Sequence, residues 1–199
     1  MSEPTNLTVD VHLSRWIVED GNYDDFRVGE MRRFALELWA PSPLTRTTER
    51  VMSLRPHSDH SYSVSGRLVF AADGVCVIDC GVLAYSEHPS EIEAGCSVGD
   101  FVRGDLSFGV DPFFYMAYHY KIPGIPALIY EWRINSIQQD TTPYILSDDS
   151  GRKMYVRDGT QRSFKAVQET DKNLSIPSDH GPAFVLFCTR LDTEPRHEL

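Results

Sequence analysis

The sequence predicts a mainly β protein built around a small antiparallel barrel, closed or partly open, and three patterns lead to this prediction. Residues 61–71 alternate apolar and polar side chains, which is typical of a strand with one buried face. The dipeptide Asp73-Gly74 follows, and it tolerates the positive φ angles that tight hairpin turns require. Further strands are predicted over 75–85 and 101–110. Together these three strands form a β-meander at the centre of the fold.

Two strands and two loops are predicted before the meander. Alternating apolar residues over 7–13 indicate the first strand, and an acidic loop follows over 19–25. Apolar residues also recur at every second position within 31–40, which indicates the second strand, and prolines end it. Residues 44–60 are polar and irregular, so we expect a mobile loop there.

A short helical insert is predicted around the last strands of the barrel. Residues 88–93 are expected to form one helical turn with a proline near its start. Asp111-Pro112 then begins a short helix over 113–120, because aspartate caps helix N-termini and proline fits the first helical position. Residues 127–137 are predicted to be the final barrel strand.

The C-terminal part of the chain is more polar and predicts β-hairpins. The expected strand pairs are 144–146 with 153–156, and 164–170 with 183–191. The residues after Leu191 are expected to be a frayed tail. At 199 residues the chain is long enough for one domain with a core. We therefore predict a single domain over 1–199, in which an extension of hairpins at 138–199 packs on a barrel core at 31–137.

The order of these elements resembles that of an OB-fold-like barrel over 31–137. The resemblance is carried by Gly66, the Asp73-Gly74 turn, the Val98-Gly99-Asp100 segment and Trp132. It is a resemblance to a fold, and it transfers no functional residue to this chain. Barrels of this kind bind oligonucleotides or oligosaccharides in many proteins, and the same fold also supports unrelated functions.

Composition favours a cytoplasmic protein with an acidic surface. The formal net charge of −10 disfavours nonspecific contact with nucleic acid or anionic membrane, so nucleic acid is an unexpected partner. The first residues lack the basic and apolar regions of a signal peptide, and no apolar run is long enough to span a membrane. Three of the four cysteines lie in or beside apolar strands, which favours buried thiols and a reducing compartment.

The standard catalytic and cofactor motifs are missing, so no cofactor is expected and a catalytic role is disfavoured. The chain contains no phosphate-binding loop, dinucleotide fingerprint, nucleophile elbow or His-Glu-x-x-His sequence. His57, Asp59 and His60 are the one candidate metal site, because two imidazoles and a carboxylate suit a divalent ion. A solvated loop explains the same three residues, since no cysteine lies at a diagnostic spacing.

An unusually aromatic segment lies at residues 113–120, and it is the main candidate for a binding surface. One helix face cannot easily bury all of its large side chains, so some of them are available to a ligand or a dimer contact. Packing against the end of the barrel is the alternative for part of this set. The candidate binding residues are Phe114, Tyr115, Tyr118, His119, Tyr120 and Trp132.

Three functions compete on these observations. The leading hypothesis is a non-enzymatic cytoplasmic barrel that binds a partner through the aromatic surface, either another protein or a second copy of the chain, and no membrane. The first alternative is a barrel that binds single-stranded oligonucleotides or oligosaccharides. The second alternative is a metal-dependent hydrolase that uses His57 and His60.

Overall fold

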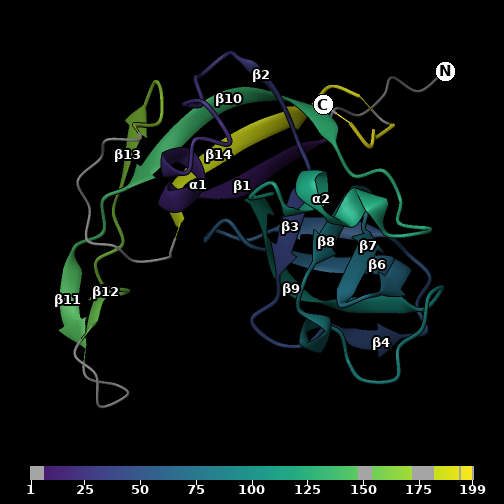
Figure 1. Ribbon diagram of the computed structural model, residues 1–199. Coiled ribbons are helices and arrows are strands. Elements are labelled where there is room, and N and C mark those ends of the chain that lie inside the picture. The colour runs from purple at the N-terminus through teal and green to yellow at the C-terminus, as the bar shows by residue number, and fades with distance from the viewer. Residues whose placement is uncertain (1–6, 148–153, 172–181, 193, 199) are drawn as a thin grey trace, which may run out of the picture.

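In the computed structural model, which describes residues 7–147, 154–171, 182–192 and 194–198, five strands close into a barrel (Figure 1). They pair in the cycle β3–β8–β7–β6–β9–β3, and only β3 and β8 run parallel. The predicted mainly β fold with a small barrel is therefore confirmed. The barrel strands are β3 (Leu36–Trp39), β6 (Tyr62–Ala72), β7 (Val75–Asp79), β8 (Leu83–Ser86) and β9 (Phe101–Val110).

Four of these strands form a Greek key. Strands β6, β7 and β8 are consecutive and antiparallel, and β9 returns to lie beside β6. A five-stranded Greek-key barrel is the arrangement of OB-folds. The single strand predicted over 75–85 is in fact the hairpin of β7 and β8, because Gly81 between them adopts a φ of +100° and reverses the chain.

The strand that closes the barrel is not the predicted one. We expected 127–137 to be the final barrel strand, but β10 (Tyr130–Asp140) lies outside the barrel and pairs with β14 (Pro182–Arg190). The closing strand is β3, and Leu36 and Leu38 belong to the core cluster of the barrel. Alternation in a sequence shows which face of a strand is buried, but it does not show which strand lies alongside.

A second sheet lies beside the barrel and is joined to it through β1 (Figure 1). Strand β14 lies between β1 and β10, and β1 makes a short parallel contact with β9 at Val11 and Phe108. The predicted pairing of 164–170 with 183–191 is wrong, because β13 and β14 pair with opposite edges of β10. The remaining strands of this sheet are β1 (Thr8–Ser14), β2 (Met31–Phe34) and β13 (Phe164–Val167).

Short elements complete the fold. The segment 44–60 is not entirely irregular, because it contains β4 and β5, which pair with β9 and β6. The predicted hairpin at 144–156 is confirmed, although its connecting residues 148–153 lie outside the described residues. The short elements are β4 (Thr45–Thr47), β5 (Ser53–Pro56), β11 (Tyr144–Ser147), β12 (Met154–Arg157), α1 (Arg15–Glu19), η1 (Pro89–Glu91), α2 (Phe114–Ala117) and η2 (His119–Lys121).

The aromatic helix is shorter than predicted, and it covers the outside of the barrel. Phe113 has a φ of +76° and Tyr118 departs from helical angles, so α2 spans a single turn. Strand β7 is buried on both faces: Cys76 and Ile78 belong to the barrel core, whereas Val77 packs in a second cluster with Tyr115 of α2. The helix therefore serves in part as a cover for the barrel wall.

The tail after Leu191 is not frayed over its described residues. Ile129 and Arg196 exchange two backbone hydrogen bonds of 2.9 and 2.8 Å. His197 then stacks on Tyr115, and its Nδ1 lies 2.8 Å from the Tyr115 hydroxyl. The tail consequently packs on the aromatic segment from the side of β10.

Candidate functional site

A cleft of about 660 Å³ opens where the barrel, the second sheet and the C-terminal extension meet, and we call it the central cleft. Its volume lies in the range of pockets that hold small molecules. Its lining mixes charged, hydroxyl and aromatic side chains from all three parts of the fold. The charged and aromatic lining residues are His12, Trp39, Asp59, His60, Asp105, Asp140, Arg157, Arg162, Phe164 and Phe184.

The barrel wall of the cleft is an indole ring that lies on a glycine. Trp39 is the last residue of β3, and its register partner Ser107 on β9 also lines the cleft. A Cβ atom built on Gly109 would lie only 2.4 Å from Trp39 Cη2, so the ring rests directly on the Gly109 backbone. Trp39 was not among the residues predicted from the sequence to form a site. Its place at the end of a strand, followed by a proline pair, was the only available signal.

A tight turn at 57–61 brings His60 to the cleft. His57 N donates a hydrogen bond of 2.8 Å to Ser61 O, and His60 between them has a φ of +64°, which is rare for residues other than glycine. The Asp59 carboxylate accepts hydrogen bonds from the Ser61 amide at 3.3 Å and the Ser61 hydroxyl at 2.6 Å. These bonds lower the pKa of Asp59, so it is ionised at neutral pH.

The His60 ring is held by partners from three strands of the second sheet. Its Nδ1 lies 2.9 Å from Asp10 Oδ2 on β1. The rings of Phe164 and Phe187 approach it edge-on, with centroids 5.4 and 5.5 Å away. A carboxylate on Nδ1 favours the tautomer in which Nε2 accepts hydrogen bonds. His60 therefore presents a fixed imidazole at the cleft wall.

His12 lies next to His60 and is neutral at pH 7. Burial lowers its pKa, and the neighbouring His60 lowers it further. The two ring centroids are 6.3 Å apart.

The C-terminal extension forms the opposite wall. Arg157 Nη1 lies 3.1 Å from Asp140 Oδ1 and also donates to the carbonyl oxygens of Asp140 and Thr142. The Arg157 guanidinium lies over the Tyr144 ring, 4.8 Å from its centroid. Arg162 is exposed at the rim. The wall thus supplies both hydrogen-bond donors and acceptors.

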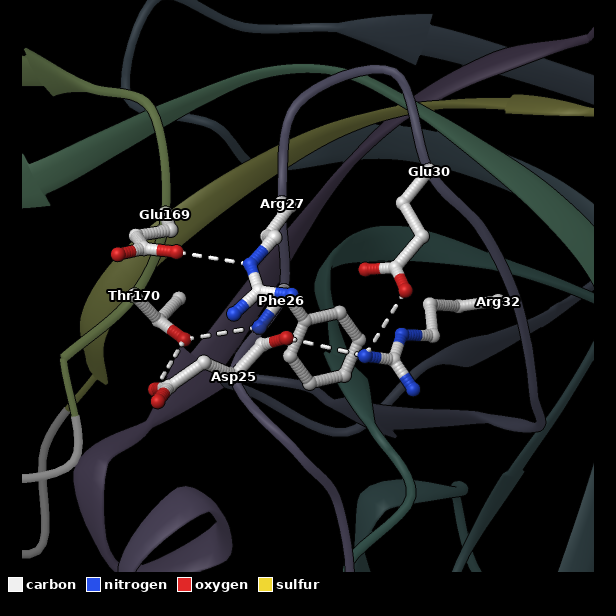
Figure 2. Close-up of polar contacts among 7 residues, drawn as sticks. All are labelled: Asp25, Phe26, Arg27, Glu30, Arg32, Glu169 and Thr170. Atoms are coloured by element: carbon white, nitrogen blue, oxygen red, sulfur yellow. Dashed lines mark hydrogen bonds and ion pairs between the residues drawn. The ribbon is translucent and has the colours of Figure 1, made fainter.

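A polar clamp fixes this wall against the loop between α1 and β2 (Figure 2). The Thr170 hydroxyl accepts a hydrogen bond of 2.9 Å from Phe26 N and donates one of 3.0 Å to Asp25 Oδ1. Beside it, Arg27 and Glu169 form an exposed ion pair of 2.8 Å. Because Thr170 follows β13 closely, the clamp positions the strand that carries Phe164 into the cleft.

Two of the predicted binding residues lie in the protein interior. Trp132 has no exposed surface, stacks on Phe34 and donates a hydrogen bond of 3.1 Å to the Phe34 carbonyl. Tyr115 is also fully buried, and its hydroxyl donates to Pro126 O at 3.0 Å. These two aromatic side chains stabilise the fold and offer no surface to a partner.

The other four predicted residues lie at or near the surface. Tyr118 is 68 % exposed, and Phe114 precedes it by one helical turn. Tyr120 is half-buried beneath the Lys121 ammonium, and His119 Nε2 lies 2.5 Å from Glu87 Oε1. Only part of the predicted set is therefore available for binding.

Helix α1 adds a tryptophan that was not among the predicted binding residues. The Trp16 ring lies 6.3 Å from the Phe114 ring and is 37 % exposed. We call Trp16, Phe114 and Tyr118 the aromatic patch. No sequence pattern links α1 to α2, because almost 100 residues separate them and only the tertiary fold brings them together.

The candidate metal ligands do not converge. His57 Nε2 lies 3.4 Å from Asp105, His60 lies against Asp10, and Asp59 bonds to Ser61. Within the described part of the chain, no three histidine, cysteine, aspartate or glutamate side chains are grouped so that they could hold a metal ion. The ligand set that a hydrolase at His57 and His60 would need is thus not assembled there.

Two carboxyl groups, those of Asp111 and Glu37, are buried and do not line the central cleft. Asp111 has no exposed surface, and its Oδ1 accepts hydrogen bonds from the Tyr85 hydroxyl at 2.5 Å and from Tyr115 N at 3.1 Å. Burial raises its pKa. Burial, together with the charges of Glu87 and Asp111, also raises the pKa of Glu37 to about 8. Glu37 is consequently mostly protonated at neutral pH.

No family model matches this chain, and no curated protein or solved structure matches it. In the described part of the chain, none of the helices has the length and apolar character needed to cross a membrane.

Proposed function

We propose that the protein is a binding module whose ligand, an uncharged and hydroxyl-rich molecule such as a saccharide, occupies the central cleft. The observation that carries the proposal is the position of Trp39, a flat ring on one wall of a cleft that also contains Asp59 and Asp105. The negative face of an aromatic ring attracts the C–H groups of a sugar face. Carboxylates accept hydrogen bonds from hydroxyl groups, and the exposed Arg162 at the rim of the cleft can donate them.

The charges of the cleft favour this ligand over an oligonucleotide. Three aspartates and two arginines line it, and one arginine is paired with Asp140. A phosphate backbone requires a surplus of basic side chains along its path. Trp132, one of the predicted binding residues, is buried. The saccharide form of the barrel hypothesis therefore has the stronger support.

A glycan array followed by titration calorimetry tests the proposal. We expect the wild-type protein to bind a subset of saccharides and Trp39→Ala to bind them at least about tenfold more weakly, a loss of about 1.4 kcal/mol or more. Trp16→Ala is the matched control, because it removes a half-exposed tryptophan outside the cleft. An array without any bound saccharide, or equal losses in both variants, would contradict the proposal.

A second candidate function is the binding of a protein partner at the aromatic patch. The supporting observation is that Trp16 and Tyr118 remain exposed although both are large and apolar, and Phe114 lies beside Trp16. Aromatic side chains of this kind are enriched at protein interfaces. The net charge of −10 favours a basic partner. Four free cysteines are compatible with a cytoplasmic location for either function.

Crosslinking in a lysate, followed by reconstitution with the purified partner, tests the second function. We expect Tyr118→Ala to weaken the reconstituted complex at least about tenfold, since central aromatic residues dominate interface energies. Trp39→Ala is the control here and should leave the complex unchanged. A partner whose affinity is the same for the wild type and for Tyr118→Ala would rule out the aromatic patch.

A further inference from the structure

His60 and Asp10 form a dyad in which a carboxylate orients an imidazole ring. His60 Nδ1 lies 2.9 Å from Asp10 Oδ2, and the side chains of His60 and Asp10 are only 15 % and 20 % exposed. A carboxylate beside Nδ1 keeps the ring proton on that nitrogen, so Nε2 carries the free electron pair. The same pairing of a base with the group that orients it recurs in unrelated hydrolases. The dyad therefore has the parts of a general base.

Rigid strands hold both members of the dyad in place. Asp10 lies within β1, where its backbone N–H donates a hydrogen bond of 2.5 Å to the Tyr62 hydroxyl and its register partner on β14 is Phe187. Phe187 and Phe164 also approach the His60 ring edge-on. His60 itself has a φ of +64°, and strained backbone of this kind clusters at functional sites. A base that is held in this way keeps the orientation that proton transfer requires.

The dyad lies at the central cleft, where the ligand is proposed to bind. His60 and the preceding Asp59 both line the cleft. Hydrogen bonds from Ser61 lower the pKa of Asp59 most, and the charge of Arg162 lowers this pKa further. The Arg162 guanidinium is therefore close to the turn that carries His60. A cation in this place can stabilise negative charge that develops on a substrate oxygen.

The chemistry of the dyad selects the kind of bond that would react. An imidazole that accepts a proton turns water into a nucleophile for an acyl carbonyl carbon. Water is the nucleophile here because the hydroxyl group of the adjacent Ser61 donates to Asp59 instead. Cleavage of a glycosidic bond relies on a different arrangement, a pair of carboxyl groups. The three aspartates that line the cleft also disfavour phosphate esters. An acyl ester of a hydroxyl-rich molecule fits the dyad and the cleft best.

We propose that the protein hydrolyses an acyl ester of the saccharide in the central cleft, with His60 as the general base and Asp10 as its positioning residue. This inference rests on the proposed function. His60 Nε2 takes a proton from water while the water oxygen attacks the ester carbonyl carbon. The bond between that carbon and the saccharide oxygen then breaks, and Nε2 returns the proton to the departing oxygen. The products are a carboxylic acid and a free hydroxyl group on the saccharide.

Hydrolysis of p-nitrophenyl acetate and of acetylated mono- and disaccharides, measured with a metal chelator present, tests the proposal. His60→Gln removes the base, so kcat should fall about 100-fold or more while KM changes little. The variant should keep the circular dichroism of the wild type. His88→Gln is the matched control and should keep the wild-type rate, because His88 is exposed and is not among the residues that line the cleft.

Asp10→Asn distinguishes a positioning role from a structural one. Asparagine keeps the shape of the side chain, but its amide can donate to Nδ1 and thereby move the ring proton to Nε2. We expect kcat to fall about as far as in His60→Gln, with KM unchanged. NMR spectra of the imidazole nitrogens should show the exchanged tautomer of His60, which a loss of structure alone would not produce.

Equal rates for the wild type and His60→Gln, or an activity that the chelator abolishes, would overturn the proposal. A wild type that binds saccharides in calorimetry but releases no acetate from either kind of ester would also overturn it, and would leave the proposed binding function intact. Hydrolysis of p-nitrophenyl acetate that depends on His60, in a protein that binds no saccharide, would support the dyad and contradict the proposed function.

Discussion

The indole of Trp39 lies on the backbone of Gly109, so close that even a methyl group between them would displace the ring. This contact joins the end of β3 to β9 and sets the barrel wall of the central cleft. Because Gly109 has no side chain, the Trp39 ring can lie against its backbone. The addition of a single carbon atom at Gly109 should therefore change the shape of the central cleft.

Gly109→Ala should move Trp39 and destabilise the protein by about 1–3 kcal/mol, which is typical of overpacking. Urea denaturation measures the stability, and tryptophan fluorescence reports the displaced ring. Gly159→Ala is the control, because no atom lies within 4 Å of the added carbon and the residue also belongs to the cleft. Equal stability of both variants would show that Trp39 does not rest on Gly109.

Glu37→Gln should remove part of the pH dependence of stability. The pKa of Glu37 rises from 4.5 in the unfolded chain to about 8 in the folded protein. Between these values the unfolded chain has lost the proton and the folded protein retains it, so stability falls by about 1.4 kcal/mol per pH unit as pH rises. The loss is complete above pH 8.

The glutamine variant should be more stable than the wild type at pH 8, and the difference should shrink toward pH 4.5. Guanidinium denaturation across this window measures it. Glu49→Gln, at an exposed site, should follow the wild-type curve. A wild-type stability that rises between pH 5 and pH 8 in parallel with the variant would contradict the buried, protonated state of Glu37.

Tyr85→Phe should cost about 1–3 kcal/mol, because Asp111 loses a hydrogen bond of 2.5 Å in a fully buried position. Thermal and chemical denaturation at pH 7 measure the change. Tyr118→Phe is the control, since that hydroxyl group belongs to a largely exposed side chain. The idea fails if the two variants lose the same stability.

Thr170→Val should loosen the polar clamp that holds β13. The substitution keeps the shape of the side chain but leaves Phe26 N and Asp25 without their hydroxyl partner. Hydrogen exchange should become faster at the Phe26 and Thr170 amides and along β13. Thr8→Val, which removes an exposed hydroxyl contact with Thr189, should leave exchange in that region unchanged. Unchanged exchange in Thr170→Val would mean that backbone contacts, such as the hydrogen bond from Thr170 N to Phe26 O, hold the segment without the hydroxyl group.

Sequence patterns predicted the positions of the barrel strands better than they predicted which strands pair with each other. The strands predicted over 61–71 and 101–110 are found at 62–72 and 101–110, because a strand with one buried face has side chains of alternating polarity. Residues 31–40 show the same alternation, although they form two strands that are separated at Ala35. Strand β2 belongs to the second sheet, and β3 belongs to the barrel. Side-chain period is a local property, whereas the choice of a neighbouring strand depends on the whole chain.

Most of the candidate site could not be predicted from the sequence, for the same reason. The aromatic segment was conspicuous, yet Tyr115 and Trp132 proved to be core residues. The central cleft collects side chains from β1, β3, β9 and the extension, none of which is unusual in its own segment. His60 was noticed for its neighbour His57, but its partner is Asp10, 50 positions away.

The sequence by itself determined the fold class, the hairpin that turns at Asp73-Gly74 and the acidic balance, since each of these follows from local periodicity, turn chemistry or composition. Only the tertiary structure decided that β3 closes the barrel, that Trp39 lies on Gly109 and that His60 meets Asp10. The physical reason is that the pairing of distant strands depends on the free energy of the whole folded chain. The sequence of one segment therefore does not determine which segment it contacts.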